Sequence, residues 1–128
     1  MKRFILILLS LSLIISLSVE AKSQNHSWKK TTPFVPGGIK HIKDRHWFNA
    51  QATPPTSRFN RSMTISKLNS MATKAIQQGS NQSSVNGKKV HEYTFNKPIG
   101  RATNGKRAHT LRVVTSPKGE IITAFPTK

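Results

Sequence analysis

The chain of 128 residues contains no cysteine and only four acidic side chains, against twenty-one lysines and arginines. Without cysteine there is no disulfide and no thiolate metal site, so folding must rest on packing alone. The scarcity of acids argues against two classes of enzyme. Two-metal nucleases hold their metal ions with several carboxylates, and glycosidases need a pair of carboxylates that flank the scissile bond. Beyond residue 21 the acids are Asp44, Glu92 and Glu120, which lie far apart in the sequence. A Ser-His-Asp triad would have to use Asp44 as the acid that orients the histidine. Asp44 lies next to the histidines on the same short predicted helix, which argues against a triad.

Positive charge is what the sequence has in excess. The formal net charge is +17, and it falls only to +16 when Lys2, Arg3 and Glu20 are removed with the N-terminal segment. A field of this strength favours polyanionic partners, namely nucleic acid, anionic lipid or an acidic protein. The simpler interpretation is a cationic surface that serves solubility and has no specific partner.

Residues 1–21 have the pattern of a secretory signal peptide. Lys2 and Arg3 precede an apolar run over residues 4–19, and small or compact residues occupy the cleavage positions up to Ala21. We therefore expect cleavage after Ala21, a secreted or periplasmic protein, and no stable membrane insertion of the mature chain. The alternative is a retained membrane anchor, for which the run is slightly short and is interrupted by four serines.

The remaining chain begins with an arm and two helices. Residues 22–38 are broken by prolines and glycines, so we expect an extended arm that ends in a turn. Residues 39–48 fit a short helix, and residues 64–78 carry the strongest helical period of the chain. Either Ser62 or Thr64 is the expected N-cap of the second helix.

Strands follow the helices. Gly79 is the expected stop of the second helix, and the polar residues 79–89 are expected to form a connecting loop. Runs of β-branched and aromatic residues then predict strands at residues 90–95, 110–115 and 120–125. A Ser-Pro-Lys-Gly turn should join the last two into a hairpin, and Asn-Gly at 104–105 marks another turn. The predicted fold is α+β, with N-terminal helices packed on one face of a C-terminal antiparallel sheet, in one monomeric domain over residues 39–128.

The segment IKHIKDRHW, residues 39–47, holds the side chains best suited to chemistry. His41 and His46 lie there among three cations, Lys40, Lys43 and Arg45. Imidazole exchanges protons at neutral pH, and cations can hold a phosphate. This suits metal-free phosphodiester cleavage, in which one imidazole takes the ribose 2′-hydroxyl proton and a second group protonates the leaving oxygen. The substrate of such a reaction is RNA, although similar residues also occur in proteins that only bind RNA, heparin or membranes.

Helical spacing limits how the two histidines can cooperate. On an ideal helix His41 and His46 are about 140° apart, so either the helix ends or bends near Arg45, or only one histidine is catalytic. His46 continues the apolar stripe of Ile39 and Ile42, and its structural alternative is a place at the edge of the core. The alternative to a catalytic role for His41 is that it simply faces solvent. A zinc site would lack a third ligand and would add charge among cations, so we expect no metal and no cofactor.

Four motifs resemble those of a known group of ribonucleases: HIKDRHW, SRF followed by a helix, PIGRATNG and LRVVTSPKGEIITAFP. Over most of residues 39–126 the chain resembles the bacterial toxin ribonucleases of the barnase–EndoU–colicin–RelE superfamily. The nearest branches are bacterial EndoU nucleases and RNase A-like contact-dependent inhibition toxins, and the strand at residues 121–126 is the most specific part. The resemblance implies a metal-independent endoribonuclease toxin, with RNA as substrate and a cognate immunity protein as partner, which we expect to be acidic.

The resemblance also implies roles for individual residues. His46, or alternatively His41, matches the acid–base histidine. Arg58 matches a cation that follows the histidine segment, and Thr123 matches a strand threonine that contacts the phosphate, although threonine is also an ordinary strand residue. Phe125 stands where many relatives have tyrosine. An alternative interpretation is therefore that this chain is an inactive relative of these enzymes. The further candidates for binding the substrate phosphates are Phe125 itself, Lys43, Arg45, Lys106 and Arg112.

The register of the last hairpin decides which sheet face carries Thr123. If Ser116 pairs with Glu120 across a three-residue connection, Thr123 shares the apolar face of Leu111 and Val113. A connection of two or four residues places it on the opposite face, which carries the arginine and phenylalanine of the two strands. We favour the second arrangement, because a catalytic threonine needs a polar cleft with a cation.

A function of another class is also compatible with the sequence. A non-catalytic cationic secreted protein could bind RNA, an anionic membrane or an acidic protein. It predicts binding that weakens with salt and leaves RNA intact.

Overall fold

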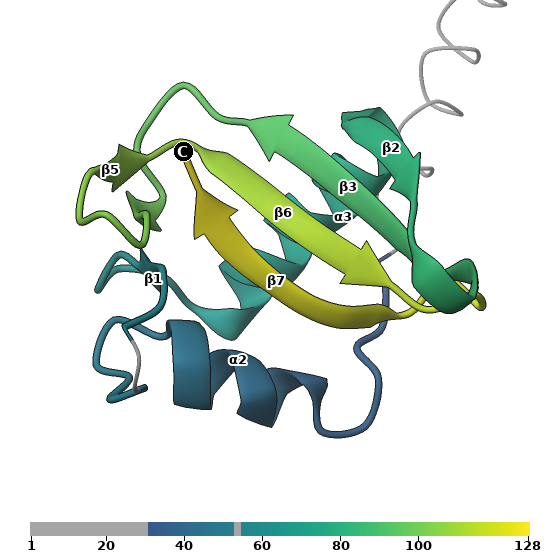
Figure 1. The fold of residues 1–128 in the computed structure, drawn as a ribbon, viewed down its shortest axis with the longest axis horizontal. Helices are drawn as coiled ribbons and strands as arrows, with labels where there is room; N and C mark the ends of the chain where they lie inside the picture. The colour runs from purple at the N-terminus through teal and green to yellow at the C-terminus, as the bar shows by residue number, and fades with distance from the viewer. Residues whose placement is uncertain (1–30, 53–54) are drawn as a thin grey trace, which may run out of the picture. The chain divides into compact units, whose positions relative to one another are not determined.

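The computed structural model describes residues 31–52 and 55–128. The predicted signal peptide and the first residues of the arm lie outside this part. Two helices, α2 (Gly38–His46) and α3 (Ile65–Gln78), accompany two antiparallel sheets (Figure 1). The strand order of the large sheet is β2 (Ser80–Ser83), β3 (Lys89–Thr94), β6 (Thr110–Thr115) and β7 (Ile121–Thr127). The small sheet has the order β1 (Arg58–Phe59), β4 (Gly100–Arg101) and β5 (Arg107–Ala108). The α+β prediction is confirmed.

Helix α3 covers one face of the large sheet. Its N-cap is Thr64, one of the two predicted residues, and the Thr64 hydroxyl accepts a hydrogen bond from the backbone N–H of Lys67. The helix buries three residues of its predicted apolar stripe, Leu68, Ala72 and Ala75. These side chains pack against β3 and β6, behind which α3 lies in Figure 1. The core therefore sits between α3 and the central strands.

Gly79 ends α3 as predicted, but not through a left-handed conformation. Its φ is −79° and its ψ is 175°, which is extended backbone open to any residue. A Cβ at this position would lie 2.4 Å from the carbonyl oxygens of both Ala75 and Glu92. Glycine is required here because the end of the helix approaches β3 closely.

Residues 79–89 are predicted as a loop, and this prediction is wrong. They form β2 and a short 3-10 turn, η2 (Val85–Gly87), before β3 begins. All four residues of β2 are exposed, so no alternation of polar and apolar side chains marks the strand. Backbone pairing with β3 forms the strand at the sheet edge.

The β6–β7 hairpin brings Thr123 to the expected face by an unexpected route. The connection has three residues, with Ser116 paired to Glu120, and not the favoured two or four. A β-bulge between Val114 and Thr115 then shifts the register. The extra residue reverses the side-chain alternation and returns Thr123 to the face that points away from α3.

The small sheet contains the second predicted hairpin. Asn104 and Gly105 lie in the turn between β4 and β5, and Gly105 has a φ of 80°, which glycine adopts without strain. The third strand, β1, comes from the segment between the helices and is not apparent in the sequence. Gly100 permits its approach, because a Cβ there would lie 2.1 Å from the carbonyl oxygen of Arg58.

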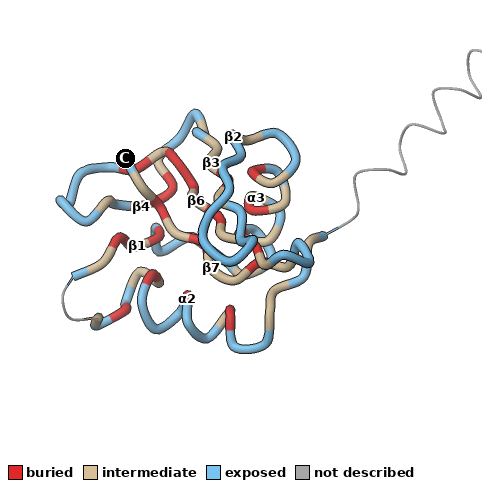
Figure 2. The backbone as a smooth tube through the Cα atoms, turned by 45° about the vertical axis from the view of Figure 1, so that its right-hand side comes forward, coloured by how far each residue is buried: buried red, intermediate tan, exposed pale blue. Residues whose placement is uncertain are grey.

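The arm and α2 lie along β7. Phe34 forms an isolated parallel bridge with Ile121, so the described end of the arm packs on the domain. Helix α2 ends at His46, two residues earlier than predicted, and Trp47 after it is extended. Ile42 is fully buried, whereas the outward side of α2 is exposed (Figure 2). Within the described residues, no helix is long and apolar enough to cross a membrane.

Candidate active site

The sheet face opposite α3 carries the polar residues of β6 and β7. Leu111 and Val113 belong to the core, so Arg112 between them points to the other face. Phe125 of β7 is the cross-strand partner of Arg112, and Thr123 lies two residues away on the same side. The end of α2 adds a histidine to this surface.

His46 is held by Phe125 and by the chain that precedes β1. Its ring stacks on that of Phe125, with centroids 4.9 Å apart and an interplanar angle of 17°. Its Nδ1 lies 2.9 Å from the carbonyl oxygen of Ser57, and the residue is 8% exposed. A carbonyl oxygen can only accept, so Nδ1–H donates and the neutral ring keeps its lone pair on Nε2.

Burial lowers the pKa of His46 below its ordinary value of 6.5, because desolvation disfavours the imidazolium form. The hydrogen bond to the Ser57 backbone raises this pKa, while the charges of His41 and Arg45 lower it further. The net effect is a ring that is neutral at pH 7 and fixed in one tautomer. A general base requires this state.

His41 lies close to His46 in spite of the helical spacing. The ring centroids are 6.1 Å apart and the ring planes are tilted by 59°. Helix α2 ends at His46, one residue after Arg45, so both histidines lie within the helix and their joint action stays a prediction. The two rings differ in access, since His41 is exposed and His46 is buried.

A cleft of about 440 Å³ opens beside these residues. It is lined by Ser57, Arg112, Phe125 and residues 102–104 and 126–128. His46 does not line the cleft itself, but it contacts Ser57 and Phe125, which both do.

Arg112 contributes positive charge to the cleft, which Lys128 also lines. Its Nη2 lies 3.0 Å from Oε1 of Glu92, and its guanidinium lies 5.9 Å from the ring centroid of Phe125. Its Nε is buried and has no hydrogen-bond partner among the described residues. Glu92 thus positions the guanidinium, and with 37% of the Arg112 side chain exposed it can still attract an anion in the cleft.

Thr123 is on the predicted face, but its hydroxyl is not accessible. Oγ1 is buried and has no hydrogen-bond partner among the described residues. This burial argues against the direct phosphate contact that the family resemblance implies. Thr127, at the far end of the same strand, is the β7 threonine that lines the cleft.

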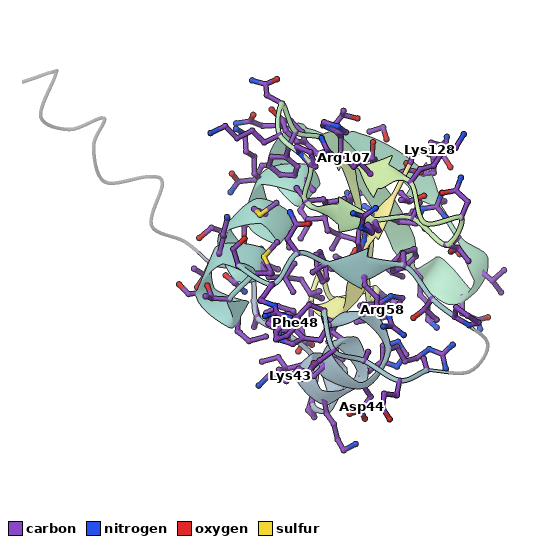
Figure 3. The ribbon with its side chains drawn as sticks, turned by 90° about the vertical axis from the view of Figure 1, so that its left-hand side faces the viewer. Lys43, Asp44, Phe48, Arg58, Arg107 and Lys128 are labelled. Carbon is purple, nitrogen blue, oxygen red and sulfur yellow. The ribbon has the colours of Figure 1, made fainter. Side chains whose placement is uncertain are left out.

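The other predicted residues lie outside this cleft. Lys43 and Arg45 are exposed on α2, and Lys106 is exposed in the β4–β5 turn. Arg58 lines a second cleft instead, also of about 440 Å³. Figure 3 shows Arg58 on β1 and Lys43 on α2.

Several residues of the site are missing from the sequence prediction, among them Ser57, Thr127 and Glu92. Ser57 acts through its carbonyl oxygen, which no side-chain pattern reveals. Thr127 follows the recognised strand motif and carries no signal of its own. Glu92 is conspicuous as one of only four acids and stands on the predicted strand 90–95, but its pairing with Arg112, 20 residues further on, has no sequence signal.

The described residues offer few side chains that could bind a metal ion together. Within residues 31–52 and 55–128, no group of three His, Cys, Asp or Glu side chains is arranged to hold a metal ion. Asp44 pairs with Lys40 and Glu92 pairs with Arg112. Both carboxylates are thus already engaged by cations.

The chain is similar to a curated nuclease. Over 91 residues it is 34% identical to the tRNA3(Ser)-specific nuclease WapA of Bacillus spizizenii. The match covers 68% of this chain and 4% of that protein, so the chain spans only a small part of the relative's length. No family model and no solved structure matches the chain.

Proposed function

We propose that this protein is an endoribonuclease that cleaves RNA without a metal ion. The observation that carries the proposal is His46, which has a lowered pKa, is held by the Ser57 carbonyl and the Phe125 ring, and thereby contacts two residues that line the cleft of Arg112. Similarity to a nuclease named for a tRNA substrate supports RNA as the substrate class. The scarcity of carboxylates supports acid–base catalysis over metal catalysis.

The proposed reaction is attack of the ribose 2′-oxygen on the adjacent phosphorus. His46 Nε2 takes the 2′-hydroxyl proton as the new O–P bond forms. The bond from phosphorus to the 5′-oxygen breaks, and protonated His41 gives its proton to that leaving oxygen. Arg112 stabilises the additional charge on the phosphoryl oxygens. The products are a 2′,3′-cyclic phosphate and a free 5′-hydroxyl.

The biological setting is part of the same proposal. We propose that residues 1–21 direct export and that the exported protein acts as a toxin. The cationic surface would then suit neutralisation by an acidic immunity protein, because opposite charges accelerate association and add specificity. Adding the purified acidic immunity protein to the purified ribonuclease and measuring the loss of ribonuclease activity would test this partner.

One assay tests the enzymatic proposal. The purified protein, incubated with an RNA mixture that includes tRNA in excess EDTA, should yield fragments that end in 2′,3′-cyclic phosphates. The low exposure of His46 favours the alternative of a protein that binds RNA without cleaving it. Intact RNA together with salt-sensitive binding would establish that alternative, and activity lost in EDTA would contradict metal independence.

The pH profile should change when Arg45 is replaced by glutamine. A general base works only when deprotonated, so kcat/KM falls as the pH drops through the lowered pKa of His46. The Arg45 charge contributes to that lowering, so Arg45→Gln should move the acidic limb to higher pH. Lys43→Gln is the matched control, because Lys43 is exposed on the same helix and is not among the causes of the shift. Profiles of kcat/KM between pH 4 and 8 decide this, and equal displacement in both variants would count against His46 as the base.

A further inference from the structure

The cleft beside His46 is the first of three that adjoin one another. It shares Ala102 and Thr103 with the cleft that contains Arg58. That second cleft shares Asn60 and Arg101 with a third, of about 350 Å³, on the same small sheet. Shared lining residues therefore link the three clefts in a path from the candidate active site to β1, β4 and β5.

Three arginines follow this path in a row, and we call them the arginine ladder: Arg58, Arg101 and Arg107. Arg58 is the cross-strand partner of Arg101, and Arg101 is the partner of Arg107. Directly paired residues project from the same sheet face, so the three side chains lie together on it. Phe59 and Ala108, their strand neighbours, are buried and belong to the opposite face. The sheet packs its apolar face inward and presents the ladder outward.

Such an arrangement is unfavourable for the protein by itself. Like charges directly opposite one another destabilise a sheet, and no aspartate or glutamate side chain lines the second or third cleft. Among the described acids, Asp44 and Glu92 pair with Lys40 and Arg112. Arg101 donates a hydrogen bond to the Gly105 carbonyl oxygen, but within the described residues no carboxylate pairs with the ladder. A polyanion would remove the repulsion.

The dimensions and the surroundings indicate which polyanion. Adjacent strands are about 4.8 Å apart, so the ladder spans roughly 10 Å, more than a single phosphate needs. In the second cleft, Arg61 lies over the Phe48 ring at 5.6 Å from its centroid. An aromatic ring with a stacked guanidinium is a surface on which a base can stack. Phosphates along the ladder and a base near Phe48 describe a nucleic acid strand.

We propose that the arginine ladder binds the RNA backbone next to the bond cleaved beside His46. This rests on the proposed ribonuclease function and specifies its substrate: a strand of several nucleotides that extends from the first cleft over the small sheet. The ladder adds binding energy through nucleotides that do not react. A dinucleotide, which cannot reach the ladder, is accordingly a poor substrate.

Binding to an uncleavable strand tests the ladder without relying on catalysis. A single-stranded DNA of twenty nucleotides is titrated at several salt concentrations with the wild type and with the double variant Arg101→Gln/Arg107→Gln. Loss of two phosphate contacts should reduce the slope of log K against log salt by about 1.4. The control, Lys88→Gln/Lys118→Gln, removes the same charge from the η2 and β6–β7 turns and should keep the wild-type slope. Equal slopes for the two double variants would overturn the proposal and point to an acidic protein as the partner of the ladder.

A cleavage assay tests whether the arginine ladder contributes to the reaction. For a twenty-nucleotide RNA, KM of the ladder variant should rise on the order of tenfold or more, as expected for lost charged hydrogen bonds. The preference for this RNA over a dinucleotide should fall in the ladder variant and persist in the control. An undiminished preference would reject the ladder as part of the substrate path. If the wild type leaves RNA intact while the DNA slopes differ, the ribonuclease proposal fails and the binding site stands.

Discussion

Replacing His46 with asparagine should lower kcat/KM for RNA by about 10²–10⁴-fold, the usual contribution of a positioned general base. The asparagine amide can still donate a hydrogen bond to the Ser57 carbonyl, which lies 2.9 Å from Nδ1 in the native protein. It has no titratable group with which to take a proton. The measurement is the initial rate of RNA cleavage in EDTA at pH 7.

The choice of asparagine separates catalysis from folding. His46 is buried and stacks on Phe125, so His46→Ala would leave a gap and an unpaired buried carbonyl that costs about 1–3 kcal/mol. The thermal unfolding of His46→Asn should therefore stay closer to that of the wild type than the unfolding of His46→Ala. Activity lost in both variants, with folding retained in the first, assigns the loss to the missing proton acceptor.

His41→Ala is the matched comparison at the second histidine, whose ring is exposed 6.1 Å away. If His41 is the general acid, this variant should be slow on RNA but recover on a nucleoside 3′-aryl phosphate, whose leaving group needs no proton. His46→Asn should stay slow on both substrates. Recovery of His46→Asn on the aryl ester would exchange the two roles, and full activity of both variants on RNA would reject the histidine mechanism.

The local sequence signals predict the two helices and three of the four strands of the large sheet, because each of these elements has a regular pattern of apolar residues. Helix α3 follows the apolar spacing that ends with Leu68, Ala72 and Ala75 buried, and Thr64 caps it. Strand β2 has no such period, since both of its faces are exposed and only backbone pairing defines it. A sequence pattern reports side-chain burial, so an exposed edge strand leaves no trace in it.

The face that carries Thr123 shows how a correct expectation can rest on an incorrect step. Turn length alone, with Ser116 paired to Glu120, would place Thr123 in the core. The bulge beside Val114 reverses that assignment, and bulges depend on packing that a turn motif does not encode. The sequence argument favours this face for the chemistry it allows, whereas the protein reaches it through the bulge.

The site itself was less predictable than the fold, because its parts come from segments far apart in the sequence. His46, Arg112 and Phe125 all appear among the candidates, but the spacing of residues could not show that His46 stacks on Phe125. The role of Arg58 came from resemblance alone, and the structure places it in the neighbouring cleft. Cross-strand pairing makes Arg58 one end of the arginine ladder, a property visible only in three dimensions.

Replacing Arg112 with glutamine should lower kcat by about 10²–10³-fold, the usual effect of losing one donor to transition-state charge. Arg112 lines the cleft, and its guanidinium is held by Glu92 at 3.0 Å. Arg112→Lys keeps the charge but not the planar set of donors, so its loss should be smaller than that of glutamine. Steady-state kinetics on a short RNA gives kcat and KM separately.

The salt bridge provides the control for the Arg112 result. Arg112→Gln leaves Glu92 half-buried without its cation, so some of the loss could come from destabilisation. Glu92→Gln/Arg112→Gln removes both charges and should restore the unfolding temperature without restoring activity. Glu92→Gln alone keeps the guanidinium, and activity near that of the wild type would define Glu92 as a positioning residue. If the double variant regains full activity, Arg112 serves the fold and the cation at the phosphate must come from elsewhere, with Lys128 of the same cleft as the next candidate.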